Sequence, residues 1–451
     1  MKPWTMLCAA LLAFGCSDSS TRTETPCNEG ECGPSLDLLW VIDNSQSMCQ
    51  EQKIIRANFR RIIEGLDANL DFHIAVTTTH MDSSYPLEPV ASPGLLQSTP
   101  QPVVGFDPTC WYAIDEQGGL LDGGDDRQLD LSPVRDAIAA AVACMENPNP
   151  DAFDFTDDEI KCALPGGVTD CAIPGVCESG ECNEFSIFPD PSEYRSIPKV
   201  LRAQDYQGES GLDFERLTAD FACMSMVGTR GVRIETGLIA AVEAVSPANT
   251  GGPLNAPEGT TLDTSAPNHG FIRHGAEFAV IFVSDENDCS HEGARNVTEV
   301  SDPNRPQLIV NGCGDQVCAF AAKPGTEATS PLIPVQTLSD QFVANLTASK
   351  ARSLGPADIF VASFHGVHGP YTGEVPENCG ATDEPLITPT CLTQHGSAKS
   401  GDRYEAFLRT FPVGQHYPQA PENDPSTPLR GLICDADFGD PFTEIVQLIS
   451  D

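Results

Sequence analysis

From residue 35 onward, apolar runs of strand length alternate with helical patterns. Residues 36–42, LDLLWVI, form a nearly continuous apolar run, which is typical of a strand buried on both faces. Residues 55–66 repeat apolar positions at helical spacing, and Gly65 is the expected stop. Residues 72–79, FHIAVTTT, are rich in β-branched side chains and predict the next strand. A strand, a helix and a strand in about 45 residues predict a βαβ unit with parallel strands.

The same alternation returns in the second half of the chain. Four segments have helical spacing and two have apolar runs: helices over 229–245, 338–350, 403–411 and from Pro441 onward, and strands over 278–284 and 358–364. The alternation of helices and strands predicts an α/β fold with a doubly wound, mostly parallel central sheet flanked by helices.

Two long segments interrupt this alternation. Residues 81–220 are rich in Pro, Gly, Asp and Cys, and only 132–145 read as a helix, with Ser132 as the expected N-cap. Residues 288–336 form a second stretch without clear periodicity. We expect both segments to be loop insertions into one domain that covers residues 35–451.

Eighteen cysteines indicate the compartment in which the chain folds. Cys27 and Cys32, like Cys313 and Cys318, lie close together in turn-rich sequence, which is typical of disulfides in an oxidising compartment. Short Cys spacings also bind zinc, but the sequence has no CxxC motif and no His that completes a Cys₂His₂ pattern. We therefore expect disulfides, and we expect the first insertion to depend on them.

The N-terminal residues combine a cation, a short apolar run and a cysteine. Lys2 precedes the apolar run 6–14, which is too short to span a bilayer but fits a secretory signal, and Cys16 follows a small residue. This pattern resembles a bacterial lipoprotein signal peptide over residues 1–16, with Cys16 lipidated; an ordinary signal peptide is the alternative. The Ser/Thr/Glu/Gly/Pro-rich residues 17–34 read as a flexible tether. The resemblance implies a cell-envelope protein that crosses the inner membrane and is anchored by lipid, at the outer membrane or the cell surface.

The charge balance excludes one class of partner. The chain has 65 Asp and Glu against 25 Lys and Arg, a formal net charge of −40, and no run of Lys or Arg offsets this excess. Nucleic-acid binding needs clustered cations that displace counterions from the phosphate backbone. We therefore expect no nucleic acid among the partners.

Hydroxyl and carboxylate side chains follow the predicted strands. The first strand is followed by DNSQS at 43–47, which places Asp, Ser and Ser at alternate positions of one turn. A later strand is followed by Asp285, and Thr229 precedes a predicted helix. Ligands of doubly wound sheets bind beyond the carboxyl ends of the strands, so these oxygens are expected to meet there. Oxygen donors of this kind suit Mg²⁺, Mn²⁺ or Ca²⁺; the alternative is a turn whose Asp or Ser only caps the following helix.

The DNSQS sequence, after an apolar strand and before an amphipathic helix, resembles the metal-ion-dependent adhesion site (MIDAS) of von Willebrand factor type A (vWA) domains. The resemblance implies that Ser45 and Ser47 bind a metal ion directly, and that Asp43 binds it directly or through water. It also implies that Thr229 supplies a loop hydroxyl and that Asp285 holds a coordinated water. The implied cofactor is Mg²⁺, or Mn²⁺ or Ca²⁺ in its place.

The stretch FAVIFVSDENDCS also resembles secreted vWA domains of Gram-negative lipoproteins. The vWA resemblance covers the strands and helices of residues 35–451, and the two insertions lie outside the family pattern. It implies a cell-envelope lipoprotein, not an enzyme, that binds a protein ligand through the metal ion. A partner's Asp or Glu carboxylate is expected to complete the coordination.

Two other functions remain as alternatives to the adhesion hypothesis. One is a metal-dependent envelope hydrolase that uses His365 or His368, although the sequence has no GxSxG, P-loop or HExxH motif. The other is a structural, disulfide-rich surface protein whose metal site is empty.

Overall fold

The computed structural model describes a large part of the chain. The described residues are 34–45, 47–65, 70–81, 94–101, 131–157, 160, 177–178, 181–182, 187–208, 211–229, 231, 235–291, 332–366, 391–393, 396–412 and 430–433. Cys16, His368 and the helix predicted from Pro441 onward lie outside these residues. No helix in the described part of the chain is both long and apolar enough to span a membrane.

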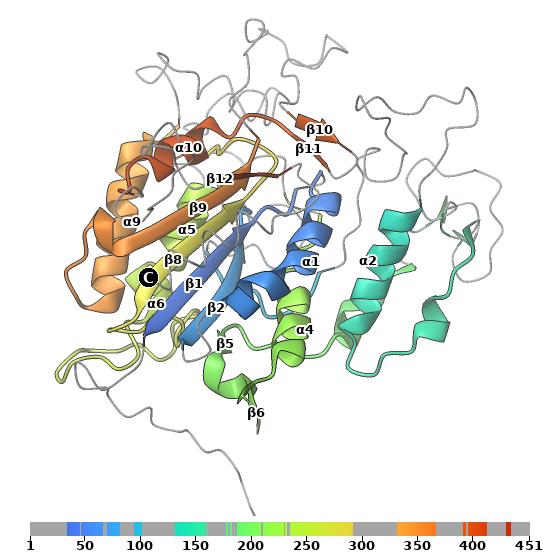
Figure 1. Ribbon diagram of the computed structural model, residues 1–451, viewed down its shortest axis with the longest axis horizontal. Coiled ribbons are helices and arrows are strands. Elements are labelled where there is room, and N and C mark those ends of the chain that lie inside the picture. The colour runs from blue at the N-terminus through green and yellow to red at the C-terminus, as the bar shows by residue number, and fades with distance from the viewer. Residues whose placement is uncertain are drawn as a thin grey trace, which may run out of the picture.

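The centre of the fold is a six-stranded sheet with the order β12-β9-β8-β1-β2-β5 (Figure 1). Its strands are β1 (Ser35–Ile42), β2 (Asp71–Thr78), β5 (Leu201–Arg202), β8 (Glu277–Val283), β9 (Ile359–His365) and β12 (Arg430–Leu432). Five strands are parallel, and the edge strand β5 runs antiparallel to β2. The mostly parallel α/β sheet predicted from the sequence is therefore confirmed.

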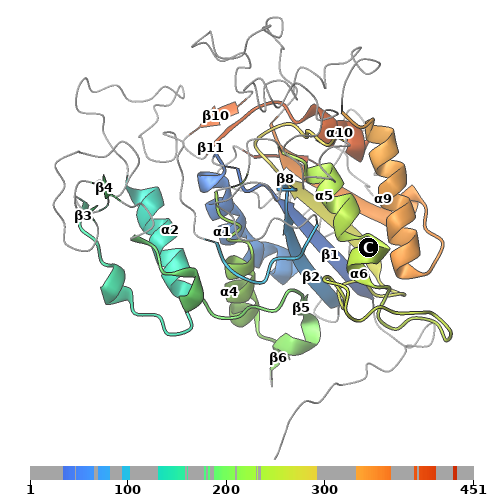
Figure 2. The ribbon, with the colours of Figure 1, turned by 180° about the vertical axis from the view of Figure 1, so that it is seen from behind.

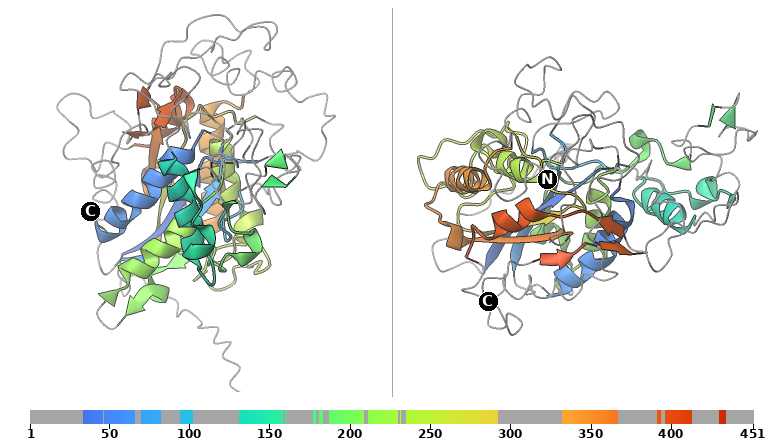
Figure 3. Two further views of the ribbon diagram at one scale, coloured as in Figure 1. Left: turned by 90° about the vertical axis from the view of Figure 1, so that its right-hand side faces the viewer. Right: turned by 90° about the horizontal axis from the view of Figure 1, so that it is seen from above.

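Helices cover both faces of this sheet. The helices of the described residues are α1 (Cys49–Gly65), α2 (Ser132–Ala143), α4 (Phe214–Met224), α5 (Gly237–Ala244), α6 (Pro247–Thr250), α9 (Val335–Lys350) and α10 (Asp402–Leu408), and all but α2 flank the sheet directly. Figure 1 shows α1 and α4 in front of the sheet, and Figure 2 shows α5, α6 and α9 in front of the opposite face. The view from above in Figure 3 separates the two helical layers.

Short strands and 3₁₀ turns lie between these helices and strands in the sequence. Three two-stranded ribbons pair β3 (Cys177–Glu178) with β4 (Glu181–Cys182), β6 (Gln207–Gly208) with β7 (Gly211–Leu212), and β10 (Cys391–Thr393) with β11 (Gly396–Ala398). Single 3₁₀ turns are η2 (Pro150–Phe153), η4 (Pro191–Glu193), η5 (Ala203–Tyr206) and η7 (Pro356–Asp358).

The strand β1 is buried on both faces, which explains its continuous apolar sequence. Trp40 belongs to the core cluster on the side of α1 and α4, whereas Leu39 and Val41 belong to the cluster on the side of α5 and α9. Trp40 packs edge-on against Phe59 of α1 and Phe221 of α4, with ring centroids 6.5 and 5.5 Å away. Aromatic pairs of this geometry add to the burial of apolar surface. The two cores hold β1 in a fixed position, so the turn that follows it is also fixed.

The order of the strands reverses beside β1. The chain passes from β1 to β2 and β5 on one side, and β8, β9 and β12 lie on the other side. The carboxyl ends of β1 and β8 are therefore neighbours at a topological switch point, where ligands bind in sheets of this kind. This edge is the upper one in Figure 1.

The region 81–220 differs from its prediction. The sequence predicted a single helix there, and α2 occupies that place, but Ser132 is its first residue and Leu131 takes the N-cap position without a side-chain bond. A further helix, α4, begins at Phe214 inside the predicted insertion and packs into the main core. Leu217, Phe221 and Met224 give α4 its buried face, a spacing that the sequence already contained.

One disulfide joins the two helices of this region. Cys144, at the end of α2, is bonded to Cys223 of α4 across 79 residues of sequence. Cys49 and Cys289 each form a disulfide as well. The bond ties α2, which lies outside α1 and α4 in Figures 1 and 2, to a helix of the main core.

Candidate functional site

The turn after β1 is built around the buried carboxylate of Asp43. Its Oδ1 accepts a hydrogen bond from the backbone N–H of Ser45 at 2.7 Å, and its Oδ2 accepts one from the hydroxyl of Ser284 at 2.6 Å. The Asp43 N–H donates to the carbonyl of Val283, the last residue of β8. Asp43 therefore fixes the turn after β1 to the end of β8, and the hydrogen-bond donors to its carboxylate lie outside α1.

The two serines of the DNSQS sequence lie side by side. The hydroxyl oxygens of Ser45 and Ser47 are 3.1 Å apart. Ser45 is buried, whereas Ser47 keeps intermediate exposure. Solvent therefore reaches this pair of hydroxyls on the side of Ser47.

The segment that carries Thr229 is held against this turn. Gln52 of α1 donates through Nε2 to the carbonyl of Gly228 at 2.6 Å and also lies 3.4 Å from the carbonyl of Asp43. The Gly231 N–H donates to the carbonyl of Asn44 at 2.7 Å. A Cβ atom at Gly231 would lie 2.5 Å from Oδ1 of Asn44, so only glycine permits this approach. The structure thus brings buried Thr229 beside the turn after β1.

Thr229 is not adjacent to a helix, contrary to the sequence prediction. The helix expected over 229–245 begins only at Gly237, as α5. Thr236 lies in the first part of the predicted helix but is bonded to another segment. It donates its N–H and its hydroxyl to the carbonyl of Thr79, which follows β2. At Thr236 these bonds to Thr79 take the place of a bond within the helix.

Asp285 follows β8 and is also buried. Its carbonyl accepts a hydrogen bond from the backbone N–H of Lys399 at 2.8 Å. It stands next to Ser284, the residue bonded to Asp43. The structure therefore places Asp43, Ser45, Ser47, Thr229 and Asp285 on three adjoining segments at the switch point.

A sixth residue at this edge is Glu235, which the sequence analysis did not identify. Its side chain is 1% exposed, and its Oε2 accepts a hydrogen bond from the hydroxyl of Thr79. Burial, and then the charge of Asp43, raise the pKa of Glu235 well above the ordinary value of a glutamate. The two carboxyl groups lie within hydrogen-bonding reach of each other. No motif surrounds Glu235, and only the fold brings it to Asp43.

The other acidic groups after β8 are paired with cations. Glu286 forms an ion pair with Lys399 at 2.6 Å, and Asp288 forms one with Arg403 at 3.0 Å. Asp288 also accepts the N–H of Leu238 at the start of α5. These two carboxylates therefore hold the surrounding segments together.

Several oxygens around the site accept no hydrogen bond from the described residues. They are Oδ1 of Asn44, Oε1 of Gln52 and Oε1 of Glu235, and all three are buried. Buried acceptors are normally satisfied, so each of these oxygens is available to a cation or to a water bound to it. Among the described residues, no three His, Cys, Asp or Glu side chains are arranged to hold a metal ion. The expected ligand set has two carboxylates and three hydroxyls, so the donor types fit Mg²⁺, Mn²⁺ or Ca²⁺ without such a cluster.

His365, the base considered for a hydrolase, lies at the end of β9. It is 1% exposed, and its Nδ1 lies 2.6 Å from the hydroxyl of Ser363. A Cβ atom at Gly401 would lie 2.4 Å from its ring, so the histidine is closely packed. Its ring stacks against Tyr404 with centroids 6.2 Å apart. These contacts give His365 a packing role at the same edge.

A second cluster of buried charges lies at the opposite edge of the sheet. Asp37 of β1 accepts hydrogen bonds from Arg273 at 2.8 Å and from Lys350 at 2.7 Å, and Lys350 also donates to the carbonyls of Arg273 and Ala276. The donors and acceptors of this cluster match one another. The cluster therefore joins three parts of the fold, which are β1, α9 and the segment before β8. It leaves no position for a ligand.

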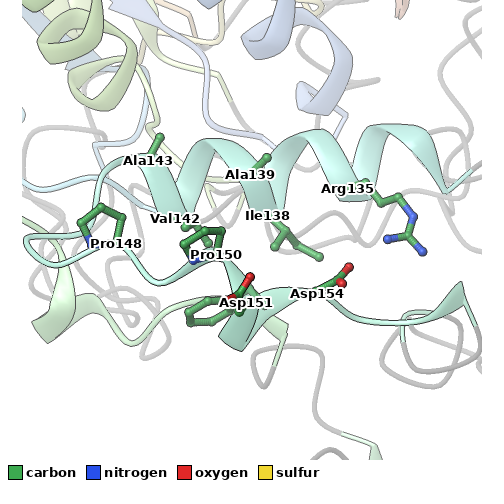
Figure 4. Close-up of a pocket in the computed structure, with 10 residues that line it drawn as sticks. Arg135, Ile138, Ala139, Val142, Ala143, Pro148, Pro150, Asp151 and Asp154 are labelled. Atoms are coloured by element: carbon green, nitrogen blue, oxygen red, sulfur yellow. The ribbon is translucent and has the colours of Figure 1, made fainter.

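A pocket of about 530 Å³ lies away from both clusters (Figure 4). It is formed between one side of α2 and the segment 148–154, and its walls are mostly alanine, proline and aliphatic side chains. Figure 4 shows Arg135 and Asp154 near one end of it. The pocket includes none of the residues of the candidate site.

Comparisons of the chain with protein-family models, with curated proteins and with solved structures gave no significant match. The structural support for the candidate site therefore comes from its own geometry.

Proposed function

We propose that this chain is a cell-envelope lipoprotein that binds a protein ligand through a divalent cation at the edge formed by β1 and β8. The observation that carries the proposal is the convergence of the Asp43 turn, the Thr229 segment and Asp285 at the topological switch point. The resemblance of the DNSQS sequence to a MIDAS supports the same chemistry. The proposed role is binding and not catalysis.

The hydroxyls of Ser45, Ser47 and Thr229 would hold the ion, and Asp43 and Asp285 would act directly or through coordinated water. The cation would supply a local positive charge with a coordination position open to an external oxygen. A carboxylate from a partner's Asp or Glu can take that position. This accounts for the binding of an acidic ligand by a chain with net charge −40, because a cation in contact outweighs surface charges that salt screens.

The envelope location follows from the N-terminal sequence and the cysteines. A lipidated Cys16 and the tether 17–34 would place the folded part at the membrane surface, and stable attachment needs more than one acyl chain. The Cys144–Cys223 disulfide agrees with an oxidising compartment.

Calorimetric titration of the purified chain with Mg²⁺, Mn²⁺ and Ca²⁺ tests the proposal. We expect uptake of one ion, and we expect the Ser45→Ala/Ser47→Ala double variant to lose at least about 10-fold in affinity, because two oxygen ligands are removed. Ser339→Ala is the matched control: Ser339 is a buried residue of α9 that shares a hydrogen bond with Thr410 and does not belong to the expected ligand set. The control should bind the ion as the wild type does.

The partner chemistry is tested with the same proteins. A surface-immobilised library of random peptides should show enrichment of Asp and Glu in the presence of the cation and none with a chelator or with the double variant. If the wild-type chain takes up none of the three ions at millimolar concentration, the proposed function is wrong.

A further inference from the structure

Glu235 has one oxygen whose surroundings are incomplete. Its Oε2 is occupied by the hydroxyl of Thr79, but its Oε1 is buried and accepts no hydrogen bond from the described residues. The oxygens of Asp43 each have a donor, from the N–H of Ser45 and the hydroxyl of Ser284. In this pair of carboxyl groups, the oxygen without a donor among the described residues is therefore Oε1 of Glu235.

Two cations of the described residues lie on the segments after β11 and in α10, and both are paired with other carboxylates. Lys399 pairs with Glu286 and Arg403 pairs with Asp288, and neither forms an ion pair with Asp43 or Glu235. Two buried carboxyl groups in contact need a positive charge between them, because the free energy of burying unpaired charge is high. Either a proton or a metal ion can supply that charge.

We propose that Glu235 is a ligand of the divalent cation of the candidate site, and that it binds the ion through Oε1. The inference rests on the proposed function, because it requires a cation at this edge. Carboxylate oxygens are preferred ligands of Mg²⁺, Mn²⁺ and Ca²⁺. Glu235 would add a full negative charge to a ligand set made mainly of neutral hydroxyls, and so contribute much of the affinity for the ion.

Thr79 acts as the positioning residue for this ligand. It follows β2, and its hydroxyl holds Oε2 of Glu235, which leaves the buried Oε1 as the oxygen without a donor among the described residues. The backbone of the next residue, Thr236, is bonded to the carbonyl of Thr79. The glutamate is therefore held in place by both its side chain and its neighbouring backbone.

The Glu235→Gln variant distinguishes a proton from a metal ion as the positive charge between Glu235 and Asp43. The side-chain amide of the variant can accept the hydrogen bond of Thr79 and donate an N–H to Asp43. If a proton lies between the carboxyl groups of Glu235 and Asp43 in the wild type, the amide N–H takes its place and the hydrogen bond is kept. The amide cannot replace a charged metal ligand. We expect the variant to melt at the wild-type temperature or above it without divalent ions, to bind the ion at least about 10-fold more weakly in calorimetry, and to lose the rise in melting temperature that the ion causes.

Asp220→Asn is the matched control for the removal of a buried carboxylate. Asp220 lies on α4, where it accepts a hydrogen bond from Tyr206 at 2.7 Å and pairs with Arg195. We expect this variant to melt at a lower temperature and to keep the cation affinity of the wild type.

Glu235→Gln with unchanged cation affinity would overturn the inference and leave the proposed function intact. Absence of cation uptake by the wild type would overturn both. If Glu235→Gln does not fold, Thr79→Val gives the decision, because it keeps both carboxyl groups and removes only the positioning hydroxyl. We expect up to about 10-fold weaker cation binding in that variant; unchanged binding would also overturn the inference.

Discussion

At the scale of single residues, glycines permit the close contacts around the site. A Cβ atom at Gly237, the first residue of α5, would lie 2.4 Å from the hydroxyl of Tyr404 and 3.2 Å from Cγ2 of Thr79. Burial, and then the charges of Asp288 and Asp43, raise the pKa of Tyr404 well above its ordinary value, so its hydroxyl stays protonated. Gly237 thus leaves room for the neutral side chain of Tyr404 beside the acidic groups of the candidate site.

Gly237→Ala is expected to destabilise the protein by about 1–3 kcal/mol, because Tyr404 is fully buried and cannot move freely. On an unobstructed helix the same change would stabilise by about 1 kcal/mol. Chemical denaturation measures the free energy of unfolding. Tyr404→Phe removes the hydroxyl, so the double variant should recover part of the loss. A Gly237→Ala protein as stable as the wild type would contradict the contact.

At the scale of elements, the start of α5 depends on a segment from another part of the chain. Thr236 occupies its N-cap position, but its hydroxyl donates to the carbonyl of Thr79 and caps no N–H group of the helix. The N–H groups of Leu238 and Ile239 donate to Asp288 and Ser290, which follow β8, at 3.0 Å each. This long-range cap fastens α5 to the loop of the candidate site, and Arg403 of α10 joins it through Asp288.

Asp288→Asn is expected to cost about 3–5 kcal/mol in the free energy of unfolding, because it leaves Arg403 buried without its carboxylate. Asp136→Asn is the control: it breaks an ion pair with Lys53 in which both side chains are about half exposed. Such pairs contribute at most about 1 kcal/mol. Equal losses in the two variants would show that Asp288 has no special role in holding α5.

At the scale of the whole molecule, the two edges of the sheet differ in their charge chemistry. The amino edge is closed by the matched cluster of Asp37, Arg273 and Lys350, whereas the carboxyl edge has buried oxygens that no donor of the described residues reaches. His73 of β2 lies beside the first cluster, where its Nδ1 is 2.9 Å from the carbonyl of Phe271. Burial, and then Arg273, lower the pKa of His73 to about 3.

Because of His73, we expect the free energy of unfolding to fall in acid. At neutral pH His73 is uncharged in the folded and the unfolded chain. As the pH falls below 6.5, the unfolded chain takes up a proton while folded His73 does not, down to about pH 3. His73 therefore lowers the free energy of unfolding by up to about 1.4 kcal/mol for each pH unit in this window.

The measurement compares denaturation of the wild type and His73→Asn from pH 7 to pH 4, so that the remaining acidic groups affect both proteins alike. The asparagine amide can keep the bond to Phe271. The stability advantage of the wild type should shrink as the pH falls. A difference that is independent of pH would contradict the lowered pKa.

The sequence by itself determined the framework of this protein. The strands β1, β2, β8 and β9 lie within one residue of the apolar runs that predicted them, and α1 and α9 follow their helical spacing. Burial on both faces of a parallel strand requires a continuous run of apolar residues, and such a requirement can be read from neighbouring positions alone. The DNSQS turn was identified for the same reason, since its oxygens lie on one short segment.

Only the tertiary structure decided what surrounds that turn. Thr236 is bonded to Thr79 beside the end of β2, which holds Glu235 near Asp43, and α5 begins only at Gly237. The short strands β5 and β12 exist through pairing with β2 and β9, since two or three residues have no periodicity of their own. Contacts between distant segments depend on how the whole chain packs, and local pattern does not encode that packing.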